Sequence, residues 1–216
     1  MVKKLVATII AASLAALLCA GAWAAEGERM KLPGPTKAGG ATLLEALSRR
    51  HTSREFAQAD LGVLQLADLL WATAGVNRAD GKKTYPTAMG RPDMSVYVFN
   101  GGGVYRYLPE SSELELIAAG DHRAETGKPS FVGQAAVNLA YVQDLSLWQD
   151  SPEMAERGSD WGFAHAGAMA QNAYLYAASQ GWSAVVRGSF DQEALAKLMK
   201  LNDKQVIRLI HSIGPK

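Results

Sequence analysis

Cysteine is nearly absent from this sequence: the only one in 216 residues is Cys19, inside an apolar N-terminal segment. If that segment is removed on export, the remaining chain has no thiol, which excludes disulfide bonds and thiol catalysis. The motifs H-E-x-x-H and G-x-S-x-G and the lysine of a phosphate-binding loop are also missing. The sequence therefore has no signature of a zinc protease, a serine hydrolase or a P-loop enzyme.

An excess of charge of either sign is lacking as well, since 22 Lys and Arg stand against 21 Asp and Glu, for a formal net charge of +1. A nucleic-acid partner normally requires a basic surface, so none is expected. The histidines are scattered, and no pair has metal-ligand spacing on a helix: His51, His122, His165 and His211. A metal site assembled by folding stays open, but we expect a cofactor to supply any chemistry.

The first 24 residues have the pattern of a signal peptide. Lys3 and Lys4 precede an apolar run that ends in Ala22-Trp23-Ala24, which predicts cleavage after Ala24. The alternative is a single membrane anchor, because the run approaches the about 20 residues that a span needs. We expect export to the periplasm or the medium, with no stable membrane anchor after cleavage.

The rest of the chain divides into a short leader and one domain. Residues 25–40 are rich in glycine, proline and charge, and predict a flexible leader. Residues 41–216 are long enough for a single domain with its own core.

Helical patterns and strand patterns alternate along this domain. Helices are predicted over 42–50, with a capping box of Thr42 and Glu45, over 59–75, with Asp60 as N-cap, and over 191–201, with Asp191 as N-cap. An alanine-rich buried helix is predicted over 161–181, after a polar loop at 146–160. Strands are predicted over 94–99, 103–108, 114–118, 135–144, 182–188 and 205–214. The expected fold class is α+β, with a mainly antiparallel sheet flanked by helices.

A basic cluster, "SRRHTSREF" at residues 48–56, follows the first of these helices. Arginine forks beside hydroxyl donors are suited to holding a phosphate. The alternative is a solvated helix end, where cations also interact favourably with the helix dipole. The cluster alone does not decide between the two.

Three stretches together resemble one family in the same order. "RRHTSREF" resembles the flavin-phosphate motif R-x-S/T-x-R/K-x-F of the nitroreductase superfamily, and "YPTAMGRPDMSVYVF" resembles its P-S-A loop and following strand. "GFAHAGAMAQNAYLYAASQGWSAVVRGSFD" resembles its central helix and flavin-edge loop. The resemblance runs from about residue 41 to 216 and is strongest to the compact subgroup related to thiazole- and oxazole-forming dehydrogenases.

The resemblance implies an FMN site with a phosphate end and a ring end. Arg50, Thr52 and Arg54 would hold the phosphate and polar flavin atoms, His51 would contribute backbone, and Lys216 would bring a second cation to the phosphate. At the ring end, Arg187 and Gly188 would present backbone N–H groups to the N5/O4 edge. The residues expected along the isoalloxazine are Pro86, Thr87, Ala88 and Met89.

The resemblance also implies an FMN-dependent oxidoreductase that works as a homodimer by a ping-pong mechanism. A small-molecule electron donor would reduce the flavin, which would then reduce an acceptor such as a quinone or nitroaromatic. No catalytic side chain is expected, and Arg91 and Trp161 are predicted to contact the substrate. Two alternatives stay open: a flavin-binding electron carrier, or a degenerate member of the family that catalyses nothing.

Overall fold

The computed structural model describes residues 26–216, so the predicted signal peptide lies outside the described residues. Within that range seven strands form one sheet in the order β1-β4-β3-β2-β5-β7-β6, and every neighbouring pair is antiparallel. The strands are β1 (Arg29–Lys31), β2 (Met94–Asn100), β3 (Gly103–Leu108), β4 (Glu113–Ala119), β5 (Val137–Asp144), β6 (Ser183–Arg187) and β7 (Gln205–Gly214). The predicted α+β class with an antiparallel sheet is confirmed.

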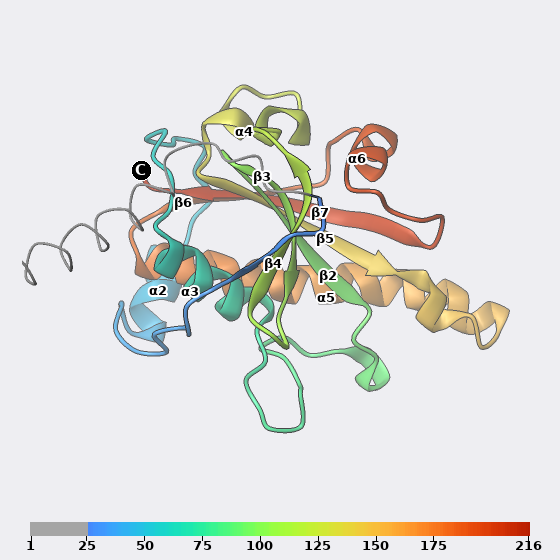
Figure 1. Ribbon diagram of the computed structural model, residues 1–216. Coiled ribbons are helices and arrows are strands. Elements are labelled where there is room, and N and C mark those ends of the chain that lie inside the picture. Colours follow the sequence, from blue (N-terminus) through green and yellow to red (C-terminus); the bar gives the residue numbers. More distant parts are fainter. Residues whose placement is uncertain (1–25) are drawn as a thin grey trace, which may run out of the picture.

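Helices cover both faces of this sheet (Figure 1). They are α2 (Leu43–Arg49), α3 (Val63–Ala74), α4 (Phe131–Gln134), α5 (Pro152–Ser179) and α6 (Gln192–Leu198), with 3-10 turns η1 (Ala88–Gly90), η2 (Arg123–Thr126) and η3 (Leu145–Trp148). No helix of the described part of the chain is long and apolar enough to cross a membrane.

Two apolar cores lie on opposite faces of the sheet because the strands alternate their side chains between the faces. On one face, Leu69 and Leu70 of α3 and Met169 of α5 pack against β2 and β5. On the other, Leu195 and Met199, in and just after α6, pack against β2, β5 and β7. Helix α5 therefore packs across one face of the sheet. The basic segment at 50–54 and the loop at 86–89, both predicted to bind a cofactor, contact this helix.

The first two helices begin in different ways. The capping box of α2 is present as predicted, with the Thr42 side chain accepting from Glu45 N and the Glu45 side chain accepting from Thr42 N. Helix α3 begins after Gly62 instead of Asp60, and the Gln65 side chain accepts from Gly62 N. Asp60 lies outside the helix, and its carboxylate pairs with Arg123 at 3.2 Å.

The 25–40 segment, expected as a flexible leader, is partly tied to the domain. Residues 29–31 form β1, which pairs with β4 at the sheet edge, and Leu32 is buried in the core. Thr36 donates from its backbone and its hydroxyl to the Asp68 carboxylate of α3. Glycine and proline content suggested a leader, but backbone pairing to an edge strand and one buried leucine hold it in place.

Helix α5 begins nine residues, about two and a half turns, earlier than predicted. Ser151 accepts from Met154 N as N-cap, and Pro152 occupies the first turn, where its missing N–H costs nothing. The expected polar loop at 146–160 is therefore a 3-10 turn followed by helix. Trp161 lies within α5 and does not begin it, which corrects its predicted place.

Candidate functional site

The basic segment 50–54 leaves α2 and runs beside the edge strand β6. Arg50 ends the helix by donating its N–H to Ala46 O at 2.9 Å. Ser53 N then donates to Ala184 O of β6 at 3.0 Å, and Ser183 Oγ donates to Ser53 Oγ at 2.9 Å. These bonds fix the backbone of the segment to the sheet, so the exposed side chains on either side of Ser53 have a defined place.

Tyr174 of α5, which no sequence pattern singled out, joins this segment to the sheet. Its hydroxyl lies 3.1 Å from Thr52 Oγ1 and accepts from Val186 N at 2.9 Å. The guanidinium of Arg50 lies 5.3 Å from the centre of its ring, within range of a cation–π contact. A single buried tyrosine thus orders both Arg50 and Thr52.

Cationic side chains gather at this place. Arg49, on the last turn of α2, pairs with Glu45 at 3.8 Å, whereas Arg50 and Arg54 make no ion pair within residues 26–216. The C-terminal Lys216 reaches the same segment, with Nζ 4.0 Å from Glu55 Oε2, and Pro215 O accepts from Ala57 N. The fold therefore brings Lys216 to the predicted phosphate cluster from the far end of the chain.

The side chain of Arg187 turns inward, and the residue as a whole is only 9% exposed. Its guanidinium donates to Thr126 O at 2.8 Å and to hydroxyl and amide oxygens of Thr126, Ser212 and Asn138. Burial lowers the pKa of Arg187 to about 10. The following Gly188 is exposed, and a Cβ placed there would meet open space. The backbone of Gly188, directly after β6, is therefore accessible to a ligand.

A buried histidine lies beneath Tyr174. The His211 ring is 4.4 Å from the Tyr174 ring, and its Nδ1 lies 3.1 Å from the Tyr141 hydroxyl. Burial, with a smaller contribution from the charge of Arg187, lowers the pKa of His211 from 6.5 to about 3. His211 is therefore neutral at physiological pH and acts as a core residue under the basic segment.

The loop predicted to line the flavin ring is held by the other side of α5. Asn172 Nδ2 donates to Thr84 O at 3.2 Å, and Ala88 N donates to His165 Nε2 at 2.8 Å. Met89 has φ 53° and ψ 20°, in the left-handed region, and is 66% exposed. The loop is thus anchored at two points and presents a large apolar side chain to solvent.

The two predicted halves of the site lie apart within one chain. His165 and Asn172 are seven residues apart and share one side of α5, whereas Tyr174 projects roughly 200° around the helix from Asn172. In Figure 1 the C terminus, which carries Lys216, lies at the left, while the green turn that leads into β2 lies at the lower right. One copy of the chain does not bring the basic segment and the 86–89 loop together.

Arg91 and Trp161, the residues predicted to contact the substrate, both pack against the ring of Trp148. Arg91 bonds to Leu147 O and the Asp150 carboxylate, and its guanidinium lies 5.0 Å from the Trp148 ring. The Trp161 ring centre is 4.7 Å from that of Trp148, which is fully buried. The structure therefore brings the two residues together around Trp148 and gives each of them a packing partner.

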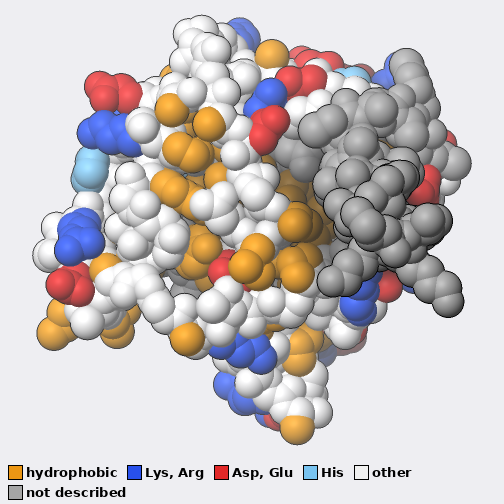
Figure 2. Space-filling model, turned by 60° about the vertical axis from the view of Figure 1, so that its left-hand side comes forward, with side chains coloured by type: hydrophobic (Ala, Val, Ile, Leu, Met, Phe, Trp, Pro, Cys, Tyr) orange, Lys and Arg blue, Asp and Glu red, His pale blue; other side chains and the backbone are white. Residues whose placement is uncertain are grey.

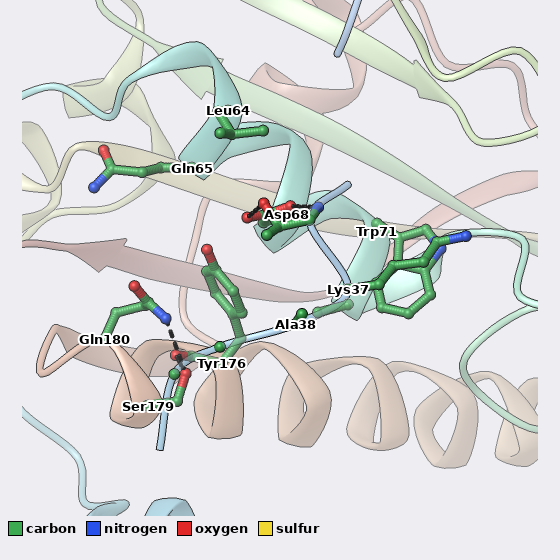
Figure 3. Close-up of a pocket in the computed structure, with 13 residues that line it drawn as sticks. Lys37, Ala38, Leu64, Gln65, Asp68, Trp71, Tyr176, Ser179 and Gln180 are labelled. Carbon is green, nitrogen blue, oxygen red and sulfur yellow. Dashed lines mark hydrogen bonds between the residues drawn. The ribbon is translucent and has the colours of Figure 1, made fainter. Parts of the chain in front are cut away.

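Cavities border both predicted halves. One of about 560 Å³ is lined in part by Tyr85, Pro86 and Thr87, and one of about 430 Å³ by residues that include Ser189 and Phe190, directly after Gly188. A further cavity of about 400 Å³ lies between residues 36–40, α3 and the end of α5, and the Asp68 and Tyr176 side chains both line it (Figure 3). No predicted site residue lines this last cavity.

Apolar side chains are exposed on the outer faces of α2 and α3. Leu44 is 77% exposed, and the others on these faces are Leu43, Leu47, Val63 and Leu64. Figure 2, which brings the left-hand side of Figure 1 forward, shows apolar side chains gathered on the surface of this region. Exposed apolar side chains that gather on one face commonly mark a protein contact.

Comparison with known proteins identifies the family. A model of the nitroreductase family matches residues 47–215, so the chain belongs to this family of oxidoreductases. A crystal structure from Ralstonia eutropha, provisionally named a nitroreductase, is 41% identical, with a TM-score of 0.81 over 89% of this chain and 91% of that one. A provisionally named nitroreductase of Methanocaldococcus jannaschii is 27% identical over 184 residues, covering 81% of this chain and 91% of the relative.

The Escherichia coli microcin synthetase complex McbBCD shares the fold at lower identity. The match has a TM-score of 0.65 and 18% identity, and covers 87% of this chain and 78% of the other. The nitroreductase fold predicted from the three motifs is therefore confirmed. At this identity the similarity to McbBCD describes the architecture alone.

Proposed function

We propose that this protein is an FMN-dependent oxidoreductase that acts as a homodimer, with each cofactor site built from two copies. The observation that carries the proposal is the gathering of Arg50, Arg54 and Lys216 beside Thr52 and the exposed backbone of Gly188. Family membership supports an oxidoreductase, and this cluster supports a phosphorylated cofactor. FMN, when bound, supplies two-electron transfer in ping-pong fashion between a donor and a small planar acceptor such as a quinone or nitroaromatic.

The hydrogen-bond donors of this site suit the two ends of FMN, the phosphate and the ring. Two guanidinium groups that make no ion pair within residues 26–216, together with one hydroxyl, suit a phosphate, which arginine binds through paired, charge-assisted hydrogen bonds. Gly188 offers backbone with no side chain to block a flat ring. The residues proposed to hold the cofactor are thus those predicted from the sequence, with Tyr174 added to order Arg50 and Thr52.

The second copy follows from the separation of the two halves. The loop 86–89 and the segment 50–54 contact different sides of α5, so a ring held between them needs the loop of a partner. The exposed leucines of α2 supply an apolar surface for association. In this arrangement the protein binds and orients the ring and excludes water from it. Arg91 and Trp161 are the residues proposed to contact the substrate.

We also propose that the protein is exported and loses residues 1–24. Support comes from the basic start, the apolar run and Ala22-Trp23-Ala24. Export would place the enzyme away from the usual cytoplasmic nicotinamide donors. Either a different donor would then reduce the flavin, or the enzyme would oxidise its substrate and pass the electrons to oxygen or a quinone.

The test is flavin binding by residues 25–216. Titration with FMN and with riboflavin, followed by flavin fluorescence, is expected to show tight binding of FMN and weaker binding of riboflavin, which lacks the phosphate. Turnover with NADH or reduced quinone and a nitroaromatic acceptor then separates an enzyme from an electron carrier. A protein that binds neither flavin would contradict the proposal.

A further inference from the structure

A buried polar cluster lies beneath the 84–90 loop, centred on Asp93. Asp93 is 2% exposed, and its carboxylate accepts three hydrogen bonds: from Trp148 Nε1 at 2.8 Å, Gln143 Nε2 at 2.6 Å and His165 Nδ1 at 2.7 Å. A buried carboxylate is costly unless such donors surround it. The cluster therefore holds the His165 ring in one orientation from below.

The hydrogen bonds define which nitrogen of His165 carries the proton. Because Ala88 N–H donates to Nε2 at 2.8 Å, Nε2 must offer a lone pair, and the ring hydrogen is on Nδ1, facing Asp93. A carboxylate behind a histidine fixes its tautomer in the same way at metal sites. Here the lone pair of Nε2 accepts a hydrogen bond from the Ala88 amide of the loop.

This amide is next to a strained residue. Met89 has positive φ without being glycine, a conformation that costs on the order of 1–3 kcal/mol and persists only where neighbouring contacts enforce it. Three hydrogen bonds lie around it: from Ala88 N to His165 Nε2 at 2.8 Å, from Arg91 N to Ala88 O at 3.0 Å and from Gly90 N to Thr87 O at 3.3 Å. Asp93 lies four residues after Met89 and fixes the other end of the turn.

We propose that His165, oriented by Asp93, is a positioning residue that holds the Ala88 amide and so presents residues 86–89 to the flavin. The proposal rests on the proposed function, since the loop meets a flavin only if the protein binds one. His165 is 4% exposed, so it acts on the cofactor only through the loop. Nε2 holds the loop by accepting from the Ala88 amide, whereas Nδ1 orients the ring by donating to Asp93.

Two substitutions separate these atoms. In His165→Gln the side-chain oxygen can reach the Nε2 position and accept from Ala88, while the Nδ1 donor is lost. In His165→Asn the amide can donate to Asp93 from the Nδ1 position, while the Nε2 acceptor is lost. Each variant loses one of the two hydrogen bonds, so a purely structural role predicts similar losses of stability and of flavin affinity in both.

The first readout is hydrogen exchange of the Ala88 amide in flavin-free protein. We expect slow exchange in the wild type and in His165→Gln, and exchange at least about tenfold faster in His165→Asn. The wild-type measurement stands even if a variant does not fold. Rapid exchange of the Ala88 amide in the wild type would overturn the proposal.

The second readout is FMN affinity. Dissociation constants are expected to stay within about threefold of wild type in His165→Gln and to rise about tenfold in His165→Asn, which corresponds to roughly 1.4 kcal/mol. Equal losses in the two variants would overturn the positioning role and leave the proposed function standing. A wild type that binds no FMN would instead remove the proposed function itself.

Discussion

Asn172 and Tyr174, two residues apart on α5, hold segments on opposite sides of the helix. Asn172 donates to Thr84 O at the start of the 84–90 loop, and the Tyr174 hydroxyl bonds to Thr52 in the basic segment. Successive helical residues are about 100° apart, so these two side chains diverge by roughly 200°. One helix thus supports both halves of the proposed site without bringing them together, which is why we propose that a second copy joins them.

Substituting Leu44 with Glu is therefore expected to weaken both association and cofactor binding. A charge on the exposed face of α2 would have to be desolvated in a dimer. Light scattering after gel filtration should show a shift toward monomer, and the FMN dissociation constant should rise at least about tenfold. Ala194→Glu, on exposed α6, which covers the opposite face of the sheet, is the matched control and should change neither. A monomeric Leu44→Glu that binds FMN normally would refute the shared site.

Arg50→Ala is expected to weaken FMN binding by about one to two decades. Charge-assisted hydrogen bonds contribute roughly 1.5–3 kcal/mol each, and Arg50 has no carboxylate partner within residues 26–216. The control is Arg49→Ala, which removes a neighbouring cation already paired with Glu45. Riboflavin binding, measured in parallel, should be nearly insensitive to Arg50→Ala. Normal FMN affinity in this variant would leave the cluster as a solvated helix end.

His211 makes stability depend on pH below about 6.5. Burial lowers its pKa from 6.5 to about 3 in the folded protein, so between these values the unfolded chain binds a proton that the folded chain does not. The free energy of unfolding should therefore fall as pH falls, by up to about 1.4 kcal/mol per pH unit from this residue.

Urea unfolding between pH 7.5 and 5.0 measures this dependence. His211→Asn, which can keep a partner for Tyr141, should be less stable at pH 7.5 but should show a flatter decline. Parallel declines in the two proteins would mean that His211 is not the titrating group.

Trp161→Ala is expected to lower stability by about 2 kcal/mol, because the Trp161 ring packs on buried Trp148. Thermal unfolding and steady-state kinetics with quinones and nitroaromatics distinguish this packing role from the predicted substrate contact. Unchanged stability with a raised KM would support the predicted substrate contact. Arg91→Ala serves as a companion, since its guanidinium contacts the same indole.

Protein recovered from the cell envelope is expected to begin at Ala25. The apolar run after Lys3 and Lys4, ending in Ala22-Trp23-Ala24, carries this prediction. N-terminal sequencing or intact mass measurement reads the cleavage point directly. Full-length chain with Met1 in a cytoplasmic fraction would exclude export.

Much of the fold was readable in the sequence because local patterns agree with the final structure. The six long strands, the capping box of Thr42 and Glu45 and the cap at Asp191 were predicted and are present. The start of α5 was missed although Ser151-Pro152 is a typical helix start, because charged residues outweighed the cap signal. Strand β1 had no such signal, since three exposed residues pair only because β4 offers an open edge.

The sequence by itself determined the residue types of the candidate site, since arginine, threonine and a small-residue loop recur as ordered motifs of a family. Only the tertiary structure decided what holds them. Tyr174, Asp93 and His165 act through hydrogen bonds that cross 72 to 122 positions of chain, and no local pattern encodes such contacts. The separation of the two halves around α5 is likewise a property of the folded protein. Asn172 and Tyr174 point to different sides of the helix, and these directions place the two halves apart only once the 84–90 loop and the basic segment have packed against α5.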